Sequence, residues 1–265
     1  MKIISADWLV ICDENNSIIQ NGAVVFTDKI QAVETLNNIE KKYPNIEIEK
    51  LAKNSVLMPG LINSHIHLEF SGNTTTLKYG NFYSWLNSVI KHREDLISKA
   101  NTKLILSKLS KMKRTGTTTI GAISSYSFDL DACVKSPLNK VFFCEVIGTK
   151  GDMIDTLFAD FKDRLNIAKK YKSANFIPAI AIHSPYSVHP FLVRETLKLA
   201  REENLPVTSH FLESREEFEW LHKDEGAFVE FFKNFLGQEQ SVTKPMEFLN
   251  LFSNIKNLSF THCVE

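Results

Sequence analysis

The chain has 265 residues, of which 43% are hydrophobic, with 31 basic and 31 acidic side chains. This composition is typical of a soluble globular protein with a sizeable core and disfavours disorder and collagen-like repeats. The formal net charge is zero, whereas proteins that bind a phosphate backbone normally carry an excess of positive charge, so nucleic acid is not expected as a partner. The expected ligand is a small molecule.

The cysteines and the apolar runs bear on the compartment. Four cysteines lie far apart without a CxxC pair, at Cys12, Cys133, Cys144 and Cys263. This spacing indicates neither a disulfide framework nor a thiolate zinc site, and it favours reduced, mostly buried thiols in a cytoplasmic protein. No apolar run approaches the roughly 20 residues that span a bilayer, so neither secretion nor a membrane partner is expected.

Two patterns divide the chain into a small β subdomain, residues 1–54, and a larger α/β part, residues 55–265. In the first part, short runs alternate apolar and polar positions between turn-forming pieces, which predicts a small antiparallel sheet. In the second part, compact apolar runs alternate with longer amphipathic stretches, which is the pattern of βα units around a parallel sheet.

The α/β part contains six predicted strands with helical stretches between them. The strands are expected at 55–62, 117–123, 141–147, 176–182, 205–210 and 258–262, and helices at 82–112, 153–171, 190–203 and 216–235. Six such units fit either an open doubly wound sheet or most of an eight-fold barrel. No GxGxxG follows the first strand, so a dinucleotide-binding fold has no support.

Four histidines fall at or just beyond the predicted carboxyl ends of strands, where the loops of a βα barrel build active sites. His65 and His67 are two residues apart, so in an extended segment both imidazoles point the same way. His210 and His262 end the fifth and sixth strands. Singly, each is more often a hydrogen-bonded core residue than a ligand. Together they favour an open catalytic site for zinc or iron.

Three motifs together resemble the amidohydrolase superfamily: the run Pro59-Gly60-Leu61-Ile62-Asn63-Ser64-His65-Ile66-His67, the pair His210-x-x-Glu213, and Thr261-His262. Within it the chain is similar to the branch of cytosine, guanine, adenosylhomocysteine and aminofutalosine deaminases, and segments 65–73 and 220–237 most resemble the last of these. The resemblance implies an α/β fold, a (β/α)8 TIM-type metal-dependent hydrolase barrel with about six of eight units present, beside a small N-terminal β-sandwich subdomain.

The resemblance also implies the roles of the site residues. One divalent metal ion, Zn²⁺ or Fe²⁺, would be held by His65, His67 and His210. His262 would hydrogen-bond the metal-bound water, and Glu213 would shuttle protons. From the sequence alone, a second possibility for Glu213 stays open. It could be a glutamate at a helix N-terminus, where the helix dipole favours a negative charge, with no role in proton transfer. His183 would touch the substrate ring or the leaving group, and the absence of a lysine in its strand implies one metal rather than two.

The implied chemistry is hydrolytic deamination of an adenine-type ring. A divalent cation lowers the pKa of bound water from about 15.7 to about 7, and the hydroxide would attack the ring carbon that bears the amino group. The implied substrate is purine nucleoside-like, with 6-aminofutalosine to futalosine in menaquinone biosynthesis as the leading reaction. Other deaminations in the branch, on adenosylhomocysteine, methylthioadenosine, guanine or cytosine, stay open, as does hydrolysis of a cyclic amide.

Substrate binding is expected from His183, Glu69, Ser84 and Trp85. Related nucleoside deaminases carry a ribose-binding glutamate just before the tryptophan of the first long helix, where this chain has Ser84. Serine cannot offer a bidentate carboxylate, so ribose recognition must differ or the ligand is not an ordinary nucleoside. Trp85 can stack on an aromatic ring.

In this superfamily an aspartate after strand eight completes the metal ligands, and residues after the barrel complete the small β domain. The chain reaches Glu265 directly after its sixth predicted strand. The first and sixth strands would then have unpaired edges, so we expect the chain to be unstable by itself. The alternative function is a catalytically inactive metal-binding remnant or a self-associating module, and a homodimer stays open.

Overall fold

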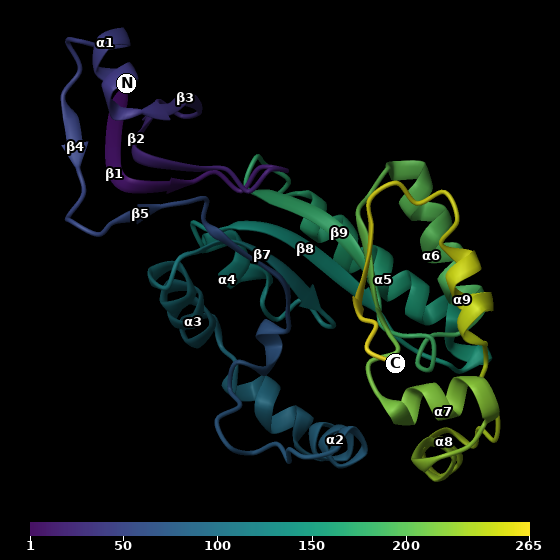
Figure 1. Cartoon of the computed structure of the whole chain (residues 1–265). Helices are drawn as coiled ribbons and strands as arrows, with labels where there is room; N and C mark the ends of the chain where they lie inside the picture. Colours follow the sequence, from purple (N-terminus) through teal and green to yellow (C-terminus); the bar gives the residue numbers. More distant parts are fainter. The chain divides into compact units, whose positions relative to one another are not determined.

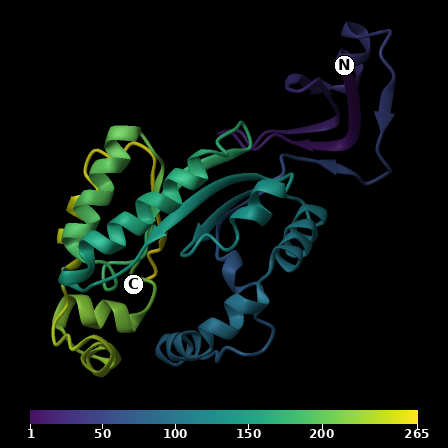
Figure 2. The same cartoon turned by 180° about the vertical axis from the view of Figure 1, so that it is seen from behind.

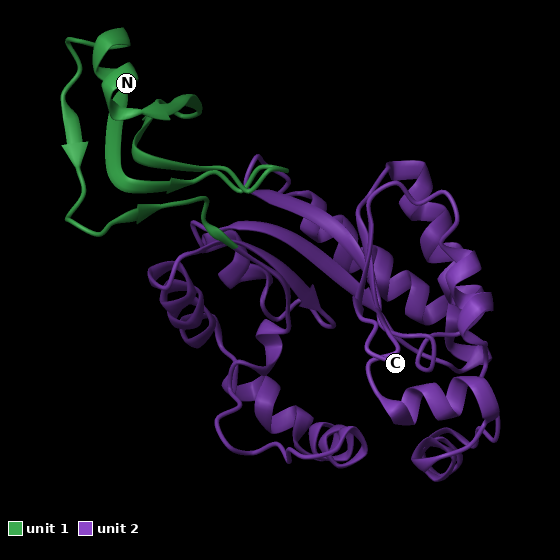
Figure 3. Cartoon of the chain, in the orientation of Figure 1, with its two compact units in different colours: residues 1–61 green, residues 62–265 purple.

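The computed structural model describes residues 1–265, which form two compact units, residues 1–61 and residues 62–265 (Figure 3). The first unit is a single five-stranded sheet with one helix, α1 (Leu36–Lys42). Its strands are β1 (Lys2–Val10), β2 (Ile18–Phe26), β3 (Ile30–Thr35), β4 (Ile48–Lys50) and β5 (Val56–Leu57). The first three pair antiparallel, whereas β4 and β5 run parallel to β1.

This mixed sheet corrects the prediction of a purely antiparallel one, and a second sandwich layer is absent from residues 1–61. The helix, which the sequence analysis did not anticipate, supplies the cover that a second sheet would give. Leu36 and Ile39 are buried together with Ile3, Ala23 and Val25 of the sheet. Because the chain crosses over through α1 before it returns to the sheet, β4 and β5 join β1 in the parallel sense.

The second unit contains a six-stranded sheet in which spatial order follows chain order (Figures 1 and 2). Its strands are β6 (Leu61–Ile66), β7 (Thr117–Ser124), β8 (Asn139–Val146), β9 (Phe176–Ile182), β10 (Val207–Phe211) and β11 (Leu258–His262). A doubly wound sheet reverses its strand order at a switch point, so this sequential order excludes that alternative. His65 Nδ1 on β6 lies 3.5 Å from Thr261 Oγ1 on β11. The two end strands therefore approach each other, and the predicted α/β barrel is confirmed as a nearly closed sheet.

Helices follow the strands as the βα pattern predicts. They are α2 (Phe82–Lys99), α3 (Thr102–Arg114), α4 (Leu130–Lys135), α5 (Ile154–Lys169), α6 (Pro190–Glu203), α7 (Arg215–Lys223), α8 (Ala227–Leu236) and α9 (Pro245–Leu251), with short 3-10 turns η1 (Leu68–Phe70) and η2 (Gly151–Met153). Helix α5 packs against β8 and β9, and helix α6 packs against β9 (Figures 1 and 2). No helix of the chain has both the length and the apolar character needed to cross a membrane.

Three predicted elements differ from the structure by more than two residues or are divided in it. The first barrel strand is Leu61–Ile66 rather than 55–62, so His65 lies inside it. The helix expected at 82–112 is two helices, because the Asn101 side chain accepts a hydrogen bond from Leu104 N at 3.0 Å and starts α3. The helix expected at 216–235 is also two, and the break contains Gly226 at a φ of 85°.

Side chains of β8 and β9 alternate between two faces. Phe142 packs in the main core with the helices, whereas Phe143 and Ala181 belong to a separate cluster on the other face of the strands. Successive side chains of a strand point to opposite faces. Glu145 therefore lies on the same face as Phe143, and His183 lies on the same face as Ala181. The strands thereby carry these polar groups to the carboxyl end of the barrel interior.

The four cysteines are free, as the spacing predicted. Cys133 and Cys144 are buried, whereas Cys12 and Cys263 are exposed. The prediction of mostly buried thiols therefore holds for two of the four.

Candidate functional site

Three imidazoles converge at the carboxyl ends of β6 and β10. The Nε2 atoms of His65 and His67 are 3.1 Å apart, those of His67 and His210 3.2 Å, and those of His210 and His65 3.1 Å. His65 and His67 point the same way because they are two residues apart at the end of an extended strand. The structure thus brings the three predicted metal ligands together in one nearly equilateral triangle.

Hydrogen bonding and burial leave these rings as neutral donors of lone pairs. His210 Nδ1 lies 2.6 Å from the carbonyl oxygen of His183, which can only accept, so Nδ1 carries the proton and Nε2 is free. Burial lowers the pKa of His65 to about 4 and that of His67 to about 3, and it also lowers the pKa of His210. Neutral imidazole is the form that binds metals.

The triangle fits a divalent cation. Zinc–nitrogen bonds of about 2.0–2.1 Å in tetrahedral geometry place ligand nitrogens about 3.3 Å apart, close to the 3.1–3.2 Å found here. His210 Nε2 carries a lone pair, and the neutral rings of His65 and His67 can each offer one from Nε2, so a cation is a partner that this donor set accepts.

Glu213 and His262 face the same region. Glu213 Oε1 lies 3.4 Å from His262 Nε2, and the ligand nitrogens of His65, His210 and His262 all lie within 4.8 Å of one another. Burial, with a smaller contribution from Glu217, raises the pKa of Glu213 to about 7. A carboxyl group with this pKa can both give and take a proton near neutral pH.

The turn that carries Glu213 toward the histidines follows directly from β10. Leu212 has a φ of 48°, and the backbone N–H groups of Leu212 and Glu213 donate to the Glu217 carboxylate at 3.0 and 2.8 Å. Ser214 caps α7, so Glu213 precedes the helix and is not a residue of its first turn. Glu217 is fully buried, and the sequence analysis did not single it out.

His183 lies beside this centre, next to His210. Its Nδ1 is 2.6 Å from Ser187 Oγ and 3.0 Å from Ser184 Oγ, and its backbone N–H donates to Val146 O at 3.1 Å. Burial lowers its pKa to about 4. The ring is therefore held neutral and in a fixed orientation against the cavity.

One cavity of about 560 Å³ joins these groups. Seven of the nine predicted site residues line it: His65, His67, Trp85, His183, His210, Glu213 and His262. Much of the remaining wall is aromatic, from Phe70, Tyr186, Phe231, Phe232 and Phe235. A polar cluster at one place in an otherwise apolar cavity of this size suits a small molecule with an aromatic ring.

Glu69 does not line this cavity, which disagrees with its predicted contact with substrate. Its carboxylate accepts hydrogen bonds from the backbone N–H groups of Ser125, Tyr126 and Phe128 at 2.8, 2.9 and 3.3 Å. The side chain therefore holds the loop that follows β7, and its oxygens are already occupied.

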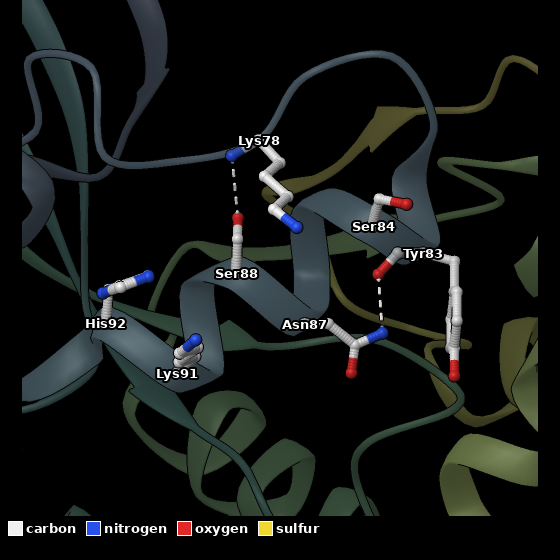
Figure 4. A pocket seen from close by; sticks show the side chains of 7 residues that line it. All are labelled: Lys78, Tyr83, Ser84, Asn87, Ser88, Lys91 and His92. Carbon is white, nitrogen blue, oxygen red and sulfur yellow. Dashed lines mark hydrogen bonds between the residues drawn. The ribbon is translucent and has the colours of Figure 1, made fainter.

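Ser84 is also outside the histidine cavity. It lies in the first turn of α2, where its N–H donates to Asn81 Oδ1 at 2.8 Å, and it lines a separate pocket with Lys78 and Lys91 (Figure 4). The next residue, Trp85, lines the histidine cavity instead. Adjacent residues on a helix point in different directions, so the expected substrate contact of Ser84 is not supported.

Comparison with known proteins places the chain among hydrolases. The sequence profile of the amidohydrolase family matches residues 56–262. The chain is 48% identical over 248 residues to the aminodeoxyfutalosine deaminase of a Nitratiruptor species, a match that covers 94% of this chain and 61% of the relative. It is 31% identical over 266 residues to an adenosine deaminase of Helicobacter pylori, covering 98% of this chain and 63% of the relative.

A crystal structure of Helicobacter pylori aminofutalosine deaminase in complex with methylthio-coformycin is similar in fold. It has a TM-score of 0.88 and 28% sequence identity, and the match covers 98% of this chain and 69% of that chain. The chain spans less than two thirds of the length of the two curated relatives. Because the family profile matches residues 56–262, which contain the whole histidine cavity, the chain belongs to the amidohydrolase family.

Proposed function

We propose that the protein is a metal-dependent aminohydrolase that deaminates an adenine-type ring of a purine nucleoside-like substrate, with aminofutalosine as the leading candidate. The observation that carries this proposal is the triangle of three Nε2 atoms with the Glu213 carboxyl group in the same cavity. The identity of 48% to an aminodeoxyfutalosine deaminase supports the substrate class.

The proposed metal ligands are His65, His67 and His210. A divalent cation held there, zinc or iron, supplies when bound a water of lowered pKa that serves as nucleophile at neutral pH. Nitrogen donors accept either metal, and supply in the cell contributes to the choice.

The proton transfers fall to this chain's own carboxyl group. Glu213, beside His262 at 3.4 Å, takes a proton from the nucleophilic water and delivers it to the ring nitrogen next to the amino-bearing carbon. It then moves the proton of the added hydroxyl group to the amino group, which leaves as ammonia. His262 orients the water through its imidazole, and His183, fixed by two serine hydroxyls, contacts the ring or the leaving group.

Purified protein loaded with Zn²⁺ or Fe²⁺ tests the proposal directly. The measurement is metal content per chain together with ammonia release from aminodeoxyfutalosine, adenosine, methylthioadenosine, guanine and cytosine. We expect one equivalent of metal and ammonia release from the adenine compounds. Bound metal without ammonia from any adenine compound contradicts the proposal and favours a metal-binding protein without turnover. A homodimer stays open, and light scattering on the purified protein would measure the oligomeric state.

A further inference from the structure

A second buried carboxylate lines the cavity and has no role in the proton transfers above. Glu145 lies at the carboxyl end of β8, with 1% of its surface exposed, and it is part of the cavity wall. Its Oε2 accepts a hydrogen bond from Ser125 Oγ at 2.5 Å. Its Oε1 is buried and has no hydrogen-bond partner in the protein.

The Oε1 atom of Glu145 therefore needs a hydrogen-bond donor that the protein does not provide. A buried carboxylate oxygen without a hydrogen bond is unfavourable because it has lost water and gained nothing in exchange. Burial accordingly raises the pKa of Glu145 to about 7, while the positive charges of Arg164 and Arg93 act in the opposite direction. Arg93 also lines the cavity, with its guanidinium 4.4 Å from the centre of the Tyr126 ring.

A second metal ion is a poor candidate for the missing partner. Glu145, His183 and His210 place ligand atoms within 4.8 Å of one another. However, His210 has no spare nitrogen, because Nδ1 donates to a carbonyl and Nε2 belongs to the triangle with His65 and His67. Without His210, only Glu145 and His183 remain, and two protein ligands are fewer than the three that hold a metal in an open catalytic site.

The chemistry of the proposed ligand supplies the donor. Only two carboxylates line the cavity, and Glu213 is engaged beside His262. A nucleoside carries its amino group at the reacting carbon, so its remaining strong donors are the ribose hydroxyls. Since Glu69 and Ser84 lie outside the cavity, Glu145 is the carboxylate that can receive them.

We propose that Glu145, held by Ser125, accepts a hydrogen bond from a ribose hydroxyl and thereby selects ribonucleoside-type substrates. This inference rests on the proposed function. A site built to hydrogen-bond a hydroxyl discriminates strongly against the analogue that lacks it, because a buried polar group is then left unpaired. Glu145 is thus a specificity residue, distinct from the proton-transferring Glu213.

The test compares substrates that differ by one hydroxyl. For the metal-loaded protein we measure kcat/KM with adenosine, 2′-deoxyadenosine and 3′-deoxyadenosine, in the native chain and in Glu145→Gln and Glu145→Ala. The native protein should prefer adenosine over at least one deoxy analogue by about 10- to 100-fold, the range of a hydrogen bond to a charged group. Glu145→Ala should remove most of that preference. Glu202→Gln, on the exposed face of α6, is the matched control and should keep it.

Two results overturn the proposal. In the first, the native protein has the same kcat/KM for adenosine and for both deoxy analogues. In the second, the variants lose kcat/KM by the same factor on adenosine and on both analogues. Glu145→Gln preserves the side-chain shape, and thermal unfolding verifies its fold. If the native protein deaminates no adenine compound, the proposed function fails, and calorimetric binding of inosine against 2′- and 3′-deoxyinosine decides on Glu145 alone. A hydroxyl preference that Glu145→Ala abolishes supports the assignment, and equal affinities refute it.

Discussion

At the scale of single residues, two carboxyl groups in one cavity have different surroundings and therefore different tasks. Glu213 is 3.4 Å from an imidazole at the metal-binding end, whereas Glu145 is bound by a serine hydroxyl and fully buried. Burial raises the pKa of both to about 7. Their neighbours, rather than their acidity, separate a proton carrier from a hydrogen-bond acceptor.

Replacement of Glu213 by glutamine should severely impair turnover and leave the proposed metal in place. Glutamine keeps the side-chain shape but cannot carry a proton, and positioned acid–base catalysis contributes about 10²- to 10⁴-fold in rate. The measurement is kcat for ammonia release alongside metal content, with Glu202→Gln as control. A fully metallated variant that retains most of its activity would remove Glu213 from the mechanism.

The sequence was sufficient to place the histidines, and it failed for residues whose partners lie on other strands. His65 and His67 follow from the two-residue period of a strand, and His210 from its strand end. The contacts of Glu69 could not be predicted, because its local pattern does not show that backbone N–H groups of the loop after β7 donate to its carboxylate. Glu145 was missed because only the packed barrel reveals its unpaired oxygen.

At the scale of elements, the close approach of β6 and β7 positions the first histidines. An added Cβ at Gly121 in β7 would collide with the backbone carbonyl of Ser64, which immediately precedes His65. The absence of a side chain at Gly121 therefore lets β6 lie where its imidazoles reach those of β10. At the β10–α7 turn a side chain does the positioning instead: the buried Glu217 carboxylate accepts a hydrogen bond from the backbone N–H of Glu213 and fixes its place.

Gly121→Ala should therefore weaken metal binding without altering any ligand. The backbone of β6 has to shift, and ligand geometry at the triangle tolerates little displacement. We expect a loss of metal affinity of about tenfold or more, the size seen when groups that orient metal ligands are changed, measured by competition with a chromogenic chelator. Gly151→Ala is the matched control, because a Cβ there meets nothing closer than 4.0 Å. Equal affinities in the two variants would show that β6 has room to adjust.

At the scale of the whole molecule, the proposed metal joins distant parts of the chain. His67 and His210 are separated by 143 residues; His67 directly follows the first strand of the six-stranded sheet, and His210 lies on the fifth. An ion that binds only the folded arrangement stabilises it, by about 2.7 kcal/mol at a concentration 100 times the dissociation constant. The unfolded chain cannot hold the three nitrogens together, so most of the binding energy adds to folding.

Thermal unfolding in the presence of metal measures this coupling. Added Zn²⁺ should raise Tm by several degrees, a chelator should reverse the rise, and the shift should grow with the logarithm of free metal. His67→Ala should abolish the shift, because two nitrogens on two strands bind far less tightly than three. His92→Ala, on α2 and outside the histidine cavity, should respond to zinc as the native chain does. A Tm that rises equally in His67→Ala would show that zinc stabilises the protein at some other place.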